Sequence, residues 1–196
     1  MMESIDYAIK MSALLGDLSE CGDLGYVKEY DQKCFICLID ILGHGRKARS
    51  LAIKAEEYLE AHYQNHLVDV MQGLHQYLHG SRGGVVLMCR LDIPSGKLIY
   101  TGIGNITGRI IGINQNRMLS KDGILGFGNI NPVISECQLT QRDLLLLHSD
   151  GIAEHFNTFD YLQLFAGDAE SIAKAVLYEL GKKTDDASCI ALKYLK

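Results

Sequence analysis

The chain has 196 residues, 47% of them hydrophobic, with 19 Lys and Arg against 24 Asp and Glu and a formal net charge of −5. This length predicts a single domain over residues 1–196, and the apolar content is enough for a packed core, which excludes a fibre or a disordered tail. The negative charge argues against a surface that binds nucleic acid through its phosphates.

The start of the chain has neither the basic segment nor the apolar run of a secretory signal. No run of about 18 apolar residues, the length that spans a bilayer, occurs further along. We therefore expect a cytoplasmic protein with no membrane partner.

Strands and helices are predicted in order along the chain. Continuous apolar runs at 34–39, 85–89 and 144–147 predict strands that are covered on both faces, since a half-exposed strand would alternate. Helical spacing of apolar residues predicts two amphipathic helices from about Arg46 to His79, and a third from about Ala169 to Leu180 with Gly181 as C-cap. The remaining signals are a hairpin turn at 93–98 and short strands at 109–113 and 189–192. Two packed sheets with helices on their outer faces suit this pattern.

The cysteines do not predict a disulfide framework or a zinc site. Four of the six lie in apolar, strand-like runs, where a free thiol behaves as a small hydrophobe: Cys34, Cys37, Cys89 and Cys189. In an extended strand, residues three apart point to opposite faces, so the C-x-x-C pair at 34 and 37 could not grip one ion. The H-x3-H pair at 75 and 79 also lies too far along the sequence from the C-x-x-C pair for the two to form a zinc finger.

Acidic residues stand at the ends of the most apolar strands. Asp40 ends the run 34–39. If residues 23–30 pair with that run through a tight turn at Asp31-Gln32, antiparallel register places Asp23 opposite Asp40. The two carboxylates would then face each other.

The C-terminal third repeats this placement. Asp150 follows the run 144–147, whereas Asp185 and Asp186 precede the run 189–192. If these strands are antiparallel neighbours, Asp150 meets Asp185 at one edge. Four or five converging carboxylates need compensating cations, and all-oxygen ligand sets select hard ions such as Mg²⁺ or Mn²⁺. By contrast, Asp17, Asp31 and Asp122 are interpreted as ordinary turn residues.

Four segments in the right order resemble one family. Asp40-Ile41-Leu42-Gly43-His44-Gly45, followed by Ala48, resembles the D-x-x-G-H-G-x-x-A segment of bacterial metal-dependent Ser/Thr phosphatases of the type 2C superfamily, in the SpoIIE-like branch. The other three matches are Gly22-Asp23 to G-D, Ser149-Asp150-Gly151 to S-D-G, and Thr184-Asp185-Asp186-Ala187-Ser188 to D-D-x-[ST]. The short chain with Gly102-Ile103-Gly104-Asn105 in its middle looks most like the stressosome phosphatases of that branch.

The resemblance implies a fold and a metal site. The fold is α+β, a four-layer α-β-β-α sandwich of two mainly antiparallel sheets flanked by helices. Asp40 would bridge two Mn²⁺ or Mg²⁺ ions, Asp150 and Asp185 would hold one of them, and Asp23 with the backbone carbonyl of Ile41 would serve the other. All four carboxylates are thereby implied to be catalytic.

The resemblance also implies a substrate and a reaction. Phosphorylated STAS-domain proteins of a stressosome would be the partners, and a water shared by the two ions would attack the phosphoserine or phosphothreonine ester in line. The segment Gly43-His44-Gly45 is expected to bind substrate phosphate at a helix start. The general acid stays open, because the family's eukaryotic His two residues after the bridging Asp is Leu42 here. His44 is the nearest candidate, whereas His148 is interpreted as a core histidine.

Two alternatives remain. The chain could be a non-catalytic module that keeps the phosphatase fold and its partner surface. It could also be a metal-dependent hydrolase of small phosphate esters or nucleotides, which predicts a deeper, basic pocket; the only arginines close to the motifs in sequence are Arg46 and Arg49.

Overall fold

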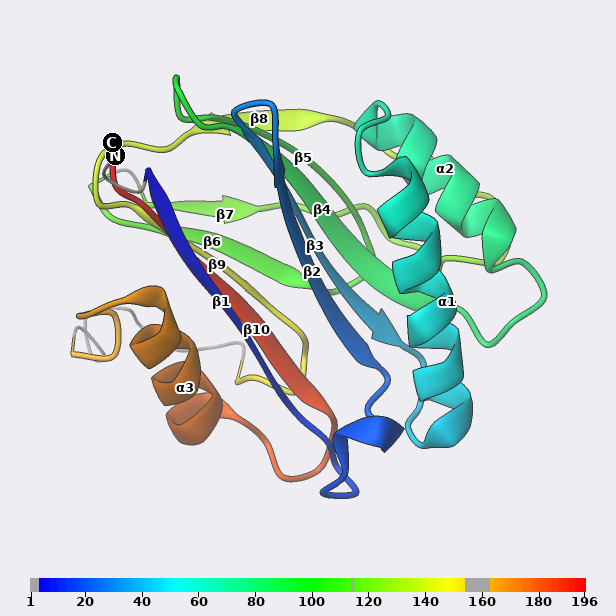
Figure 1. Cartoon of the computed structure of the whole chain (residues 1–196). Coiled ribbons are helices and arrows are strands. Elements are labelled where there is room, and N and C mark those ends of the chain that lie inside the picture. Colours follow the sequence, from blue (N-terminus) through cyan, green and yellow to red (C-terminus); the bar gives the residue numbers. More distant parts are fainter. Residues whose placement is uncertain (1–3, 114, 154–162) are drawn as a thin grey trace.

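The computed structural model describes residues 4–113, 115–153 and 163–196 and contains two antiparallel sheets packed face to face (Figure 1). One sheet has the strand order β1-β10-β9-β6-β7 and the other β2-β3-β4-β5-β8. The first sheet consists of β1 (Ile5–Ser12), β10 (Ala187–Tyr194), β9 (Leu144–His148), β6 (Thr107–Ile111) and β7 (Asn116–Met118). The second consists of β2 (Asp23–Tyr30), β3 (Lys33–Ile41), β4 (Gly84–Asp92), β5 (Lys97–Ile103) and β8 (Ser135–Gln138).

Helices cover both outer faces of this pair of sheets (Figure 1). Helices α1 (Arg46–His62) and α2 (Leu67–Tyr77) pack on the β2-to-β8 sheet, and α3 (Ala169–Leu180) packs on β1 and β10. A short 3-10 helix, η1 (Leu18–Glu20), lies between β1 and β2. The four-layer α-β-β-α arrangement predicted from the sequence is therefore confirmed.

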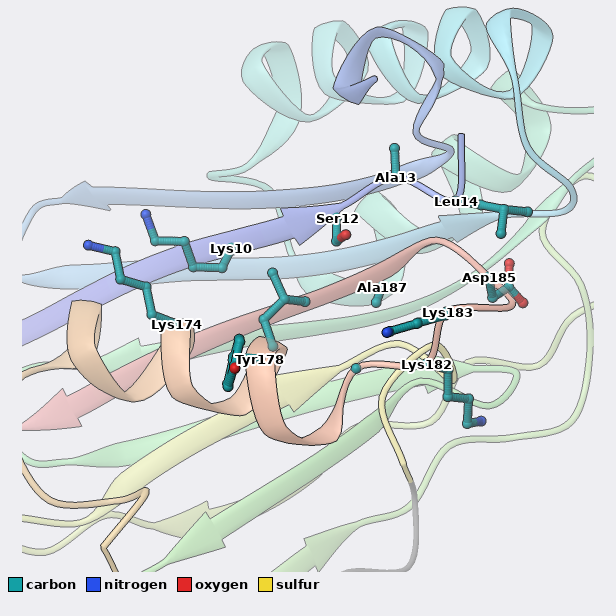
Figure 2. Close-up of a pocket in the computed structure, with 12 residues that line it drawn as sticks. Lys10, Ser12, Ala13, Leu14, Lys174, Tyr178, Lys182, Lys183, Asp185 and Ala187 are labelled. Atoms are coloured by element: carbon teal, nitrogen blue, oxygen red, sulfur yellow. The ribbon is translucent and has the colours of Figure 1, made fainter. Parts of the chain in front are cut away.

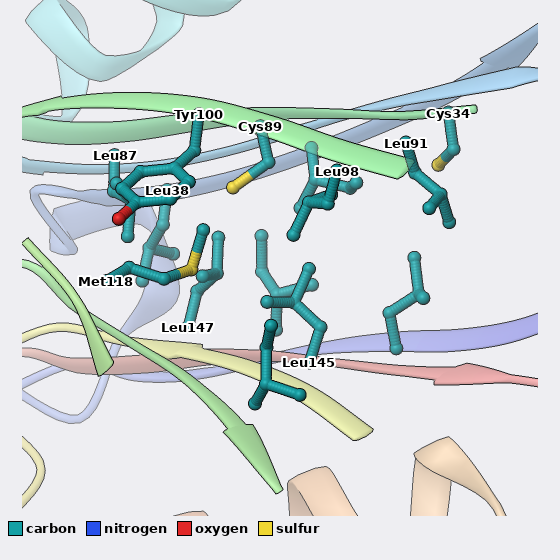
Figure 3. Close-up of a cluster of buried hydrophobic side chains, with 14 of the residues drawn as sticks. Cys34, Leu38, Leu87, Cys89, Leu91, Leu98, Tyr100, Met118, Leu145 and Leu147 are labelled. Atoms are coloured by element: carbon teal, nitrogen blue, oxygen red, sulfur yellow. The ribbon is translucent and has the colours of Figure 1, made fainter. Parts of the chain in front are cut away.

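Strand β3 shows why the apolar runs do not alternate. Cys34, Ile36 and Leu38 point into the core between the sheets, whereas Phe35, Cys37 and Ile39 pack under α1 and α2. All six side chains are fully buried, as predicted for a strand covered on both faces. Figure 3 shows Leu38 and Leu87 of one sheet meeting Leu145 and Leu147 of the other. Burying one such leucine contributes about 1.5 to 3 kcal/mol.

Most predicted elements are confirmed, including the two helices between residues 46 and 79. Helix α3 has the predicted bounds, and Gly181 caps it by donating its N–H to the carbonyl of Leu177. The hairpin turn at 93–98 joins β4 to β5. All six cysteines are free thiols.

The strand predicted at 109–113 was misplaced by two residues. The structure places β6 at Thr107–Ile111, paired with β9, and the chain turns away at Gly112, where a side chain would collide with Asp143. Ile113 is consequently 87% exposed. Strands β1, β7 and β8 were not predicted, because polar residues break their hydrophobic patterns.

No helix within the described residues is long and apolar enough to cross a bilayer.

Candidate metal and phosphate site

The β2–β3 hairpin brings the first two carboxylates together. Asp31 and Gln32 both take left-handed backbone conformations, with φ of 44° and 61°, which gives a tight two-residue turn. Tyr30 therefore pairs with Lys33, and the register continues to Asp23 opposite Asp40, as predicted. Directly opposed side chains of an antiparallel pair lie on the same face of the sheet, so the two carboxyl groups are neighbours.

The second pair comes from the other sheet. Strands β9 and β10 are antiparallel neighbours, as predicted, and the pairing continues past His148 with a hydrogen bond from Ser149 N–H to the Ser188 carbonyl (3.1 Å). This places Asp150 and Asp185 on two adjacent loops beyond the strands. Both carboxylates, together with Asp23, act electrostatically on Asp40. Four acidic side chains from two sheets thus gather at one end of the sandwich.

Burial and mutual repulsion change the protonation of this cluster. Burial, and then repulsion from Asp23, Asp150 and Asp185, raise the pKa of Asp40 to about 8. Burial also raises the pKa of Asp23, which is 1% exposed, to about 6, although the nearby hydroxyl groups of Ser188 and Ser149 oppose this shift. Cations among these groups would stabilise the ionised forms.

Asp23 has a free oxygen for such a cation. Its Oδ2 accepts a hydrogen bond from Ser149 Oγ (2.8 Å), and Ser149 Oγ in turn accepts one from the Ser188 N–H (3.0 Å). Its Oδ1 is buried and has no hydrogen-bond donor. A buried carboxylate oxygen without a donor is costly unless a cation balances it, so the donor chemistry fits a hard divalent ion.

The potential metal ligands do not surround a common point. Among the residues that the structure describes, no group of three or more His, Cys, Asp or Glu side chains is close enough together to hold an ion. Asp150 Oδ2 instead accepts a hydrogen bond from Asn105 Nδ2 (2.9 Å). Asp150 and Asp185 are exposed loop residues, so rotation of their side chains would be needed to complete a site around Asp40.

Asp186 differs from its neighbour Asp185. It is 5% exposed, and its two oxygens accept hydrogen bonds from the backbone N–H groups of Leu14 (2.8 Å) and Gly22 (2.7 Å). Asp186 therefore ties the β10 end of one sheet to the residue before Asp23 in the other. Its place as a possible fifth member of the carboxylate cluster, left open by the sequence, is better described as structural.

The predicted phosphate loop lies between Asp40 and α1. Gly43 and Gly45 have φ of 80° and 84°, a left-handed region that suits glycine, and His44 between them is exposed. Gly45 is the N-cap of α1 and provides no side-chain cap, so amide groups at this helix start can meet an anion.

Arg82 is a residue of this region that the sequence analysis missed. Its Nη1 donates a hydrogen bond to the Leu42 carbonyl (3.0 Å), and the same atom would lie 2.8 Å from a Cβ on Gly43. A guanidinium group thus lies against the loop. Forty residues separate Arg82 from Leu42, so no local motif could have indicated the contact.

A hollow of about 310 Å³ adjoins Asp150 on the side away from Asp185's strand. Asn105, Arg117, His148 and Lys182 are among its lining residues. His148 is buried and its Nδ1 lies 3.0 Å from the Ser149 carbonyl, which confirms it as a core histidine. The hollow is more basic than the sequence indicated, because Arg117 and Lys182 come from segments outside the motifs.

Comparison with known proteins decides the family. The family model described as "Stage II sporulation protein E (SpoIIE)" matches residues 30–195. The chain belongs to the SpoIIE family. It is homologous to PP2C-type Ser/Thr phosphatases, and the enzyme class implied by the motifs is confirmed at this level. No curated protein sequence matches the chain.

Solved structures of this type resemble the whole chain. A chain studied as part of "the bacterial stressosome: a modular system that has been adapted to control secondary messenger signaling" is 30% identical, with a TM-score of 0.88 over 97% of this chain and 100% of that one. RsbX in complex with magnesium is 17% identical, with a TM-score of 0.84 over 98% and 96% of the two chains. The PP2C phosphatase domain of SpoIIE from Bacillus subtilis, with a fragment of its regulatory domain, is 18% identical, with a TM-score of 0.81 over 97% and 62%.

Proposed function

We propose that this protein is a metal-dependent phosphoserine and phosphothreonine protein phosphatase, similar to RsbX, that dephosphorylates STAS-domain proteins of a stressosome. In this proposal residues 1–196 act as one catalytic domain in the cytoplasm. The observation that carries the proposal is the pairing of Asp23 with Asp40 beside Asp150 and Asp185. The likeness to a stressosome chain and to RsbX supports the choice of substrate.

The metal would be held as the family resemblance implies. Asp40 would bridge two ions, Mn²⁺ or Mg²⁺, with Asp150 and Asp185 on one and Asp23 and the Ile41 carbonyl on the other. Such ions supply positive charge that acidifies water and stabilises phosphoryl oxygens.

The chain's own groups would position the reactants. Ser149 holds one oxygen of Asp23 in place, and Asn105 holds one oxygen of Asp150. The loop Gly43-His44-Gly45 would receive the phosphate, with Arg82 neutralising part of its charge. His44, exposed on that loop, is the candidate general acid that would protonate the leaving serine or threonine oxygen.

Two specific observations each favour an alternative function. The open donor set around Asp40 is what a non-catalytic partner-binding module with this fold would show. The hollow beside Asp150, with Arg117 and Lys182, is what a hydrolase of small phosphate esters or nucleotides would use. A single phosphate-release assay distinguishes both alternatives from the proposed function.

The test measures phosphate release from a phosphorylated STAS-domain protein with Mn²⁺, with and without chelator. We expect metal-dependent release by the wild type and a loss of roughly 100-fold or more in Asp150→Asn, the scale of removing one charge-stabilising group. Arg82→Ala is expected to raise KM roughly tenfold, because one charge-assisted hydrogen bond is worth about 1.5 to 3 kcal/mol. Asp31→Asn, in the distant hairpin turn, is the matched control and should behave as wild type.

The contrary outcomes are distinct. No Mn²⁺-dependent release from any phosphoprotein would leave the binding module as the better description. Release from nucleotides alone would favour the small-ester hydrolase. Full activity in Asp150→Asn would contradict the metal assignment.

A further inference from the structure

A lysine-rich groove runs along the outside of the β1–β10 edge toward the carboxylate cluster (Figure 2). The groove has a volume of about 500 Å³ and lies between β1, α3 and the segment 181–187. Asp185 is one of its lining residues. The groove therefore adjoins the proposed metal site and shares Asp185 with it.

Positive charge is concentrated in this groove although the whole chain carries −5. Four lysines line it, Lys10, Lys174, Lys182 and Lys183, and among the lining residues Asp185 is the one carboxylate. Lys10 and Lys174 share a single acidic partner, Glu170, at 2.7 and 2.9 Å. Lys182 Nζ donates a hydrogen bond to the Asp150 carbonyl (2.5 Å), a neutral acceptor that does not cancel the lysine charge. Counted over the residues that the structure describes, these contacts leave the groove with a net positive charge.

Apolar side chains lie between the lysines. Leu14 and Leu177 are lining residues, and Tyr178, on the same face of α3, is 86% exposed. Figure 2 shows Tyr178 between Lys174 at one end of the groove and Lys183 toward the other. An exposed aromatic ring flanked by cations is typical of a contact surface for a protein segment.

A phosphoprotein that approaches the proposed site meets an electrostatic problem. The substrate is negative at its phosphate, and the whole chain carries a formal charge of −5. A positive surface immediately beside it would attract an acidic partner, fix its orientation and raise the encounter rate.

We propose that this lysine groove is a docking surface for an acidic segment, carrying apolar side chains, of the phosphoprotein on which the enzyme acts. The inference rests on the proposed function and adds the chemistry of the substrate's docking segment. Recognition would occur away from the phosphorylated residue, through Lys174, Lys183 and Tyr178.

A direct binding measurement tests the groove without any catalysis. The probe is a fluorescein-labelled peptide of alternating Glu and Leu residues, titrated with protein in chelator and followed by fluorescence anisotropy. We expect binding by the wild type at low salt, at least fivefold weaker binding by the double variant Lys174→Ala/Lys183→Ala, and weaker binding by Tyr178→Ala. The difference should shrink at about 0.5 M salt, because screening removes most of the attraction.

The matched control removes two lysines elsewhere. Lys33→Ala/Lys54→Ala changes the net charge equally at exposed positions on β3 and α1, and it should bind the peptide as wild type does. Equal weakening in both double variants, or no binding by wild type, would overturn the proposal. So would tighter binding of a single-stranded RNA oligonucleotide to the same groove.

A kinetic comparison separates this inference from the proposed function. For each variant, the ratio of kcat/KM on a phosphorylated STAS-domain protein to kcat/KM on p-nitrophenyl phosphate is measured. We expect this ratio to fall at least fivefold in Lys174→Ala/Lys183→Ala. An unchanged ratio in an active enzyme refutes the docking surface alone. Peptide binding by a protein that hydrolyses neither substrate refutes the phosphatase proposal alone.

Discussion

Among the site residues, Asp40 has the most unfavourable environment for an ionised carboxylate. It lies one residue before the end of β3, directly after the buried run Cys34–Ile39, and it faces Asp23 across the hairpin with two further carboxylates nearby. Without a counter-charge, this arrangement favours a protonated Asp40 at neutral pH, because ionisation would bury like charges together. A cation bound at the proposed site would remove this cost by balancing the ionised carboxylates.

The raised pKa of Asp40 predicts a pH dependence of stability in chelator. Its folded pKa of about 8 lies above the ordinary value of 3.8, so the native state holds a proton that the unfolded state releases. The free energy of unfolding therefore falls as pH rises from about 4 to 8. Asp40→Asn lacks this proton linkage. Between about pH 4 and 8 its free energy of unfolding should therefore rise by at least about 1 kcal/mol relative to that of the wild type, since one pKa unit corresponds to about 1.4 kcal/mol.

Urea unfolding in chelator at pH 4.5, 6 and 8 measures this difference. Asp31→Asn, which removes an exposed carboxylate at the far end of the same hairpin, should run parallel to wild type. Parallel curves for Asp40→Asn as well would contradict the assignment of a raised pKa to this residue.

At the scale of elements, the site depends on the connection between the end of β3 and the start of α1. Strand β3 ends one residue after Asp40, and the chain then passes through Gly43 and Gly45 into α1. The positive φ angles of these glycines turn the chain sharply, and the first turn of α1 packs against the residue before Asp23: a Cβ on Gly22 would lie 3.1 Å from the Ala48 Cβ. Strand end, loop and helix start thus form one unit.

Gly45→Ala tests this unit. A Cβ at Gly45 would meet no atom within 4 Å, so the expected loss of stability comes from backbone strain alone. With φ of 84° and ψ of −178°, Gly45 lies in a region that essentially only glycine adopts, and the strain should cost about 1 to 3 kcal/mol. Gly128→Ala is matched to it, with φ of 60° and likewise no atom within 4 Å. We expect both variants to lose stability in thermal unfolding, but a raised KM for p-nitrophenyl phosphate only in Gly45→Ala. An equal effect on KM in both variants would argue against a phosphate role for the loop.

At the scale of the whole molecule, the candidate site joins the two sheets. Asp23 and Asp40 belong to strands of one sheet, and Asp150 and Asp185 follow or precede strands of the other. Ser149, from the β9 side, already bonds Asp23 across this boundary. An ion shared by these residues would hold the two sheets together at this end of the sandwich.

Divalent ions should therefore stabilise the entire fold. At a concentration about 100 times Kd, binding to the native state adds about 2.7 kcal/mol. For a chain of this size that corresponds to a rise in Tm of roughly 5 to 10 °C. Thermal unfolding with Mn²⁺ or Mg²⁺ against chelator measures the shift, which should be lost in Asp40→Asn and kept in Asp31→Asn. An equal shift in both variants would place the ion elsewhere.

The sequence by itself determined the local parts of this protein. The register that opposes Asp23 to Asp40 follows from a two-residue turn, and the doubly covered strand at 34–39 and the bounds of α3 follow from apolar periodicity. Each of these depends on neighbours along the chain. The motifs then indicated the family.

Only the tertiary structure decided how distant segments meet. It placed Arg82 against the phosphate loop, separated the structural Asp186 from the exposed Asp185, and aligned four lysines in a groove beside the site. These contacts arise when buried faces of different sheets and helices pack together, and the packing distance between two elements is not encoded in the periodicity of either one.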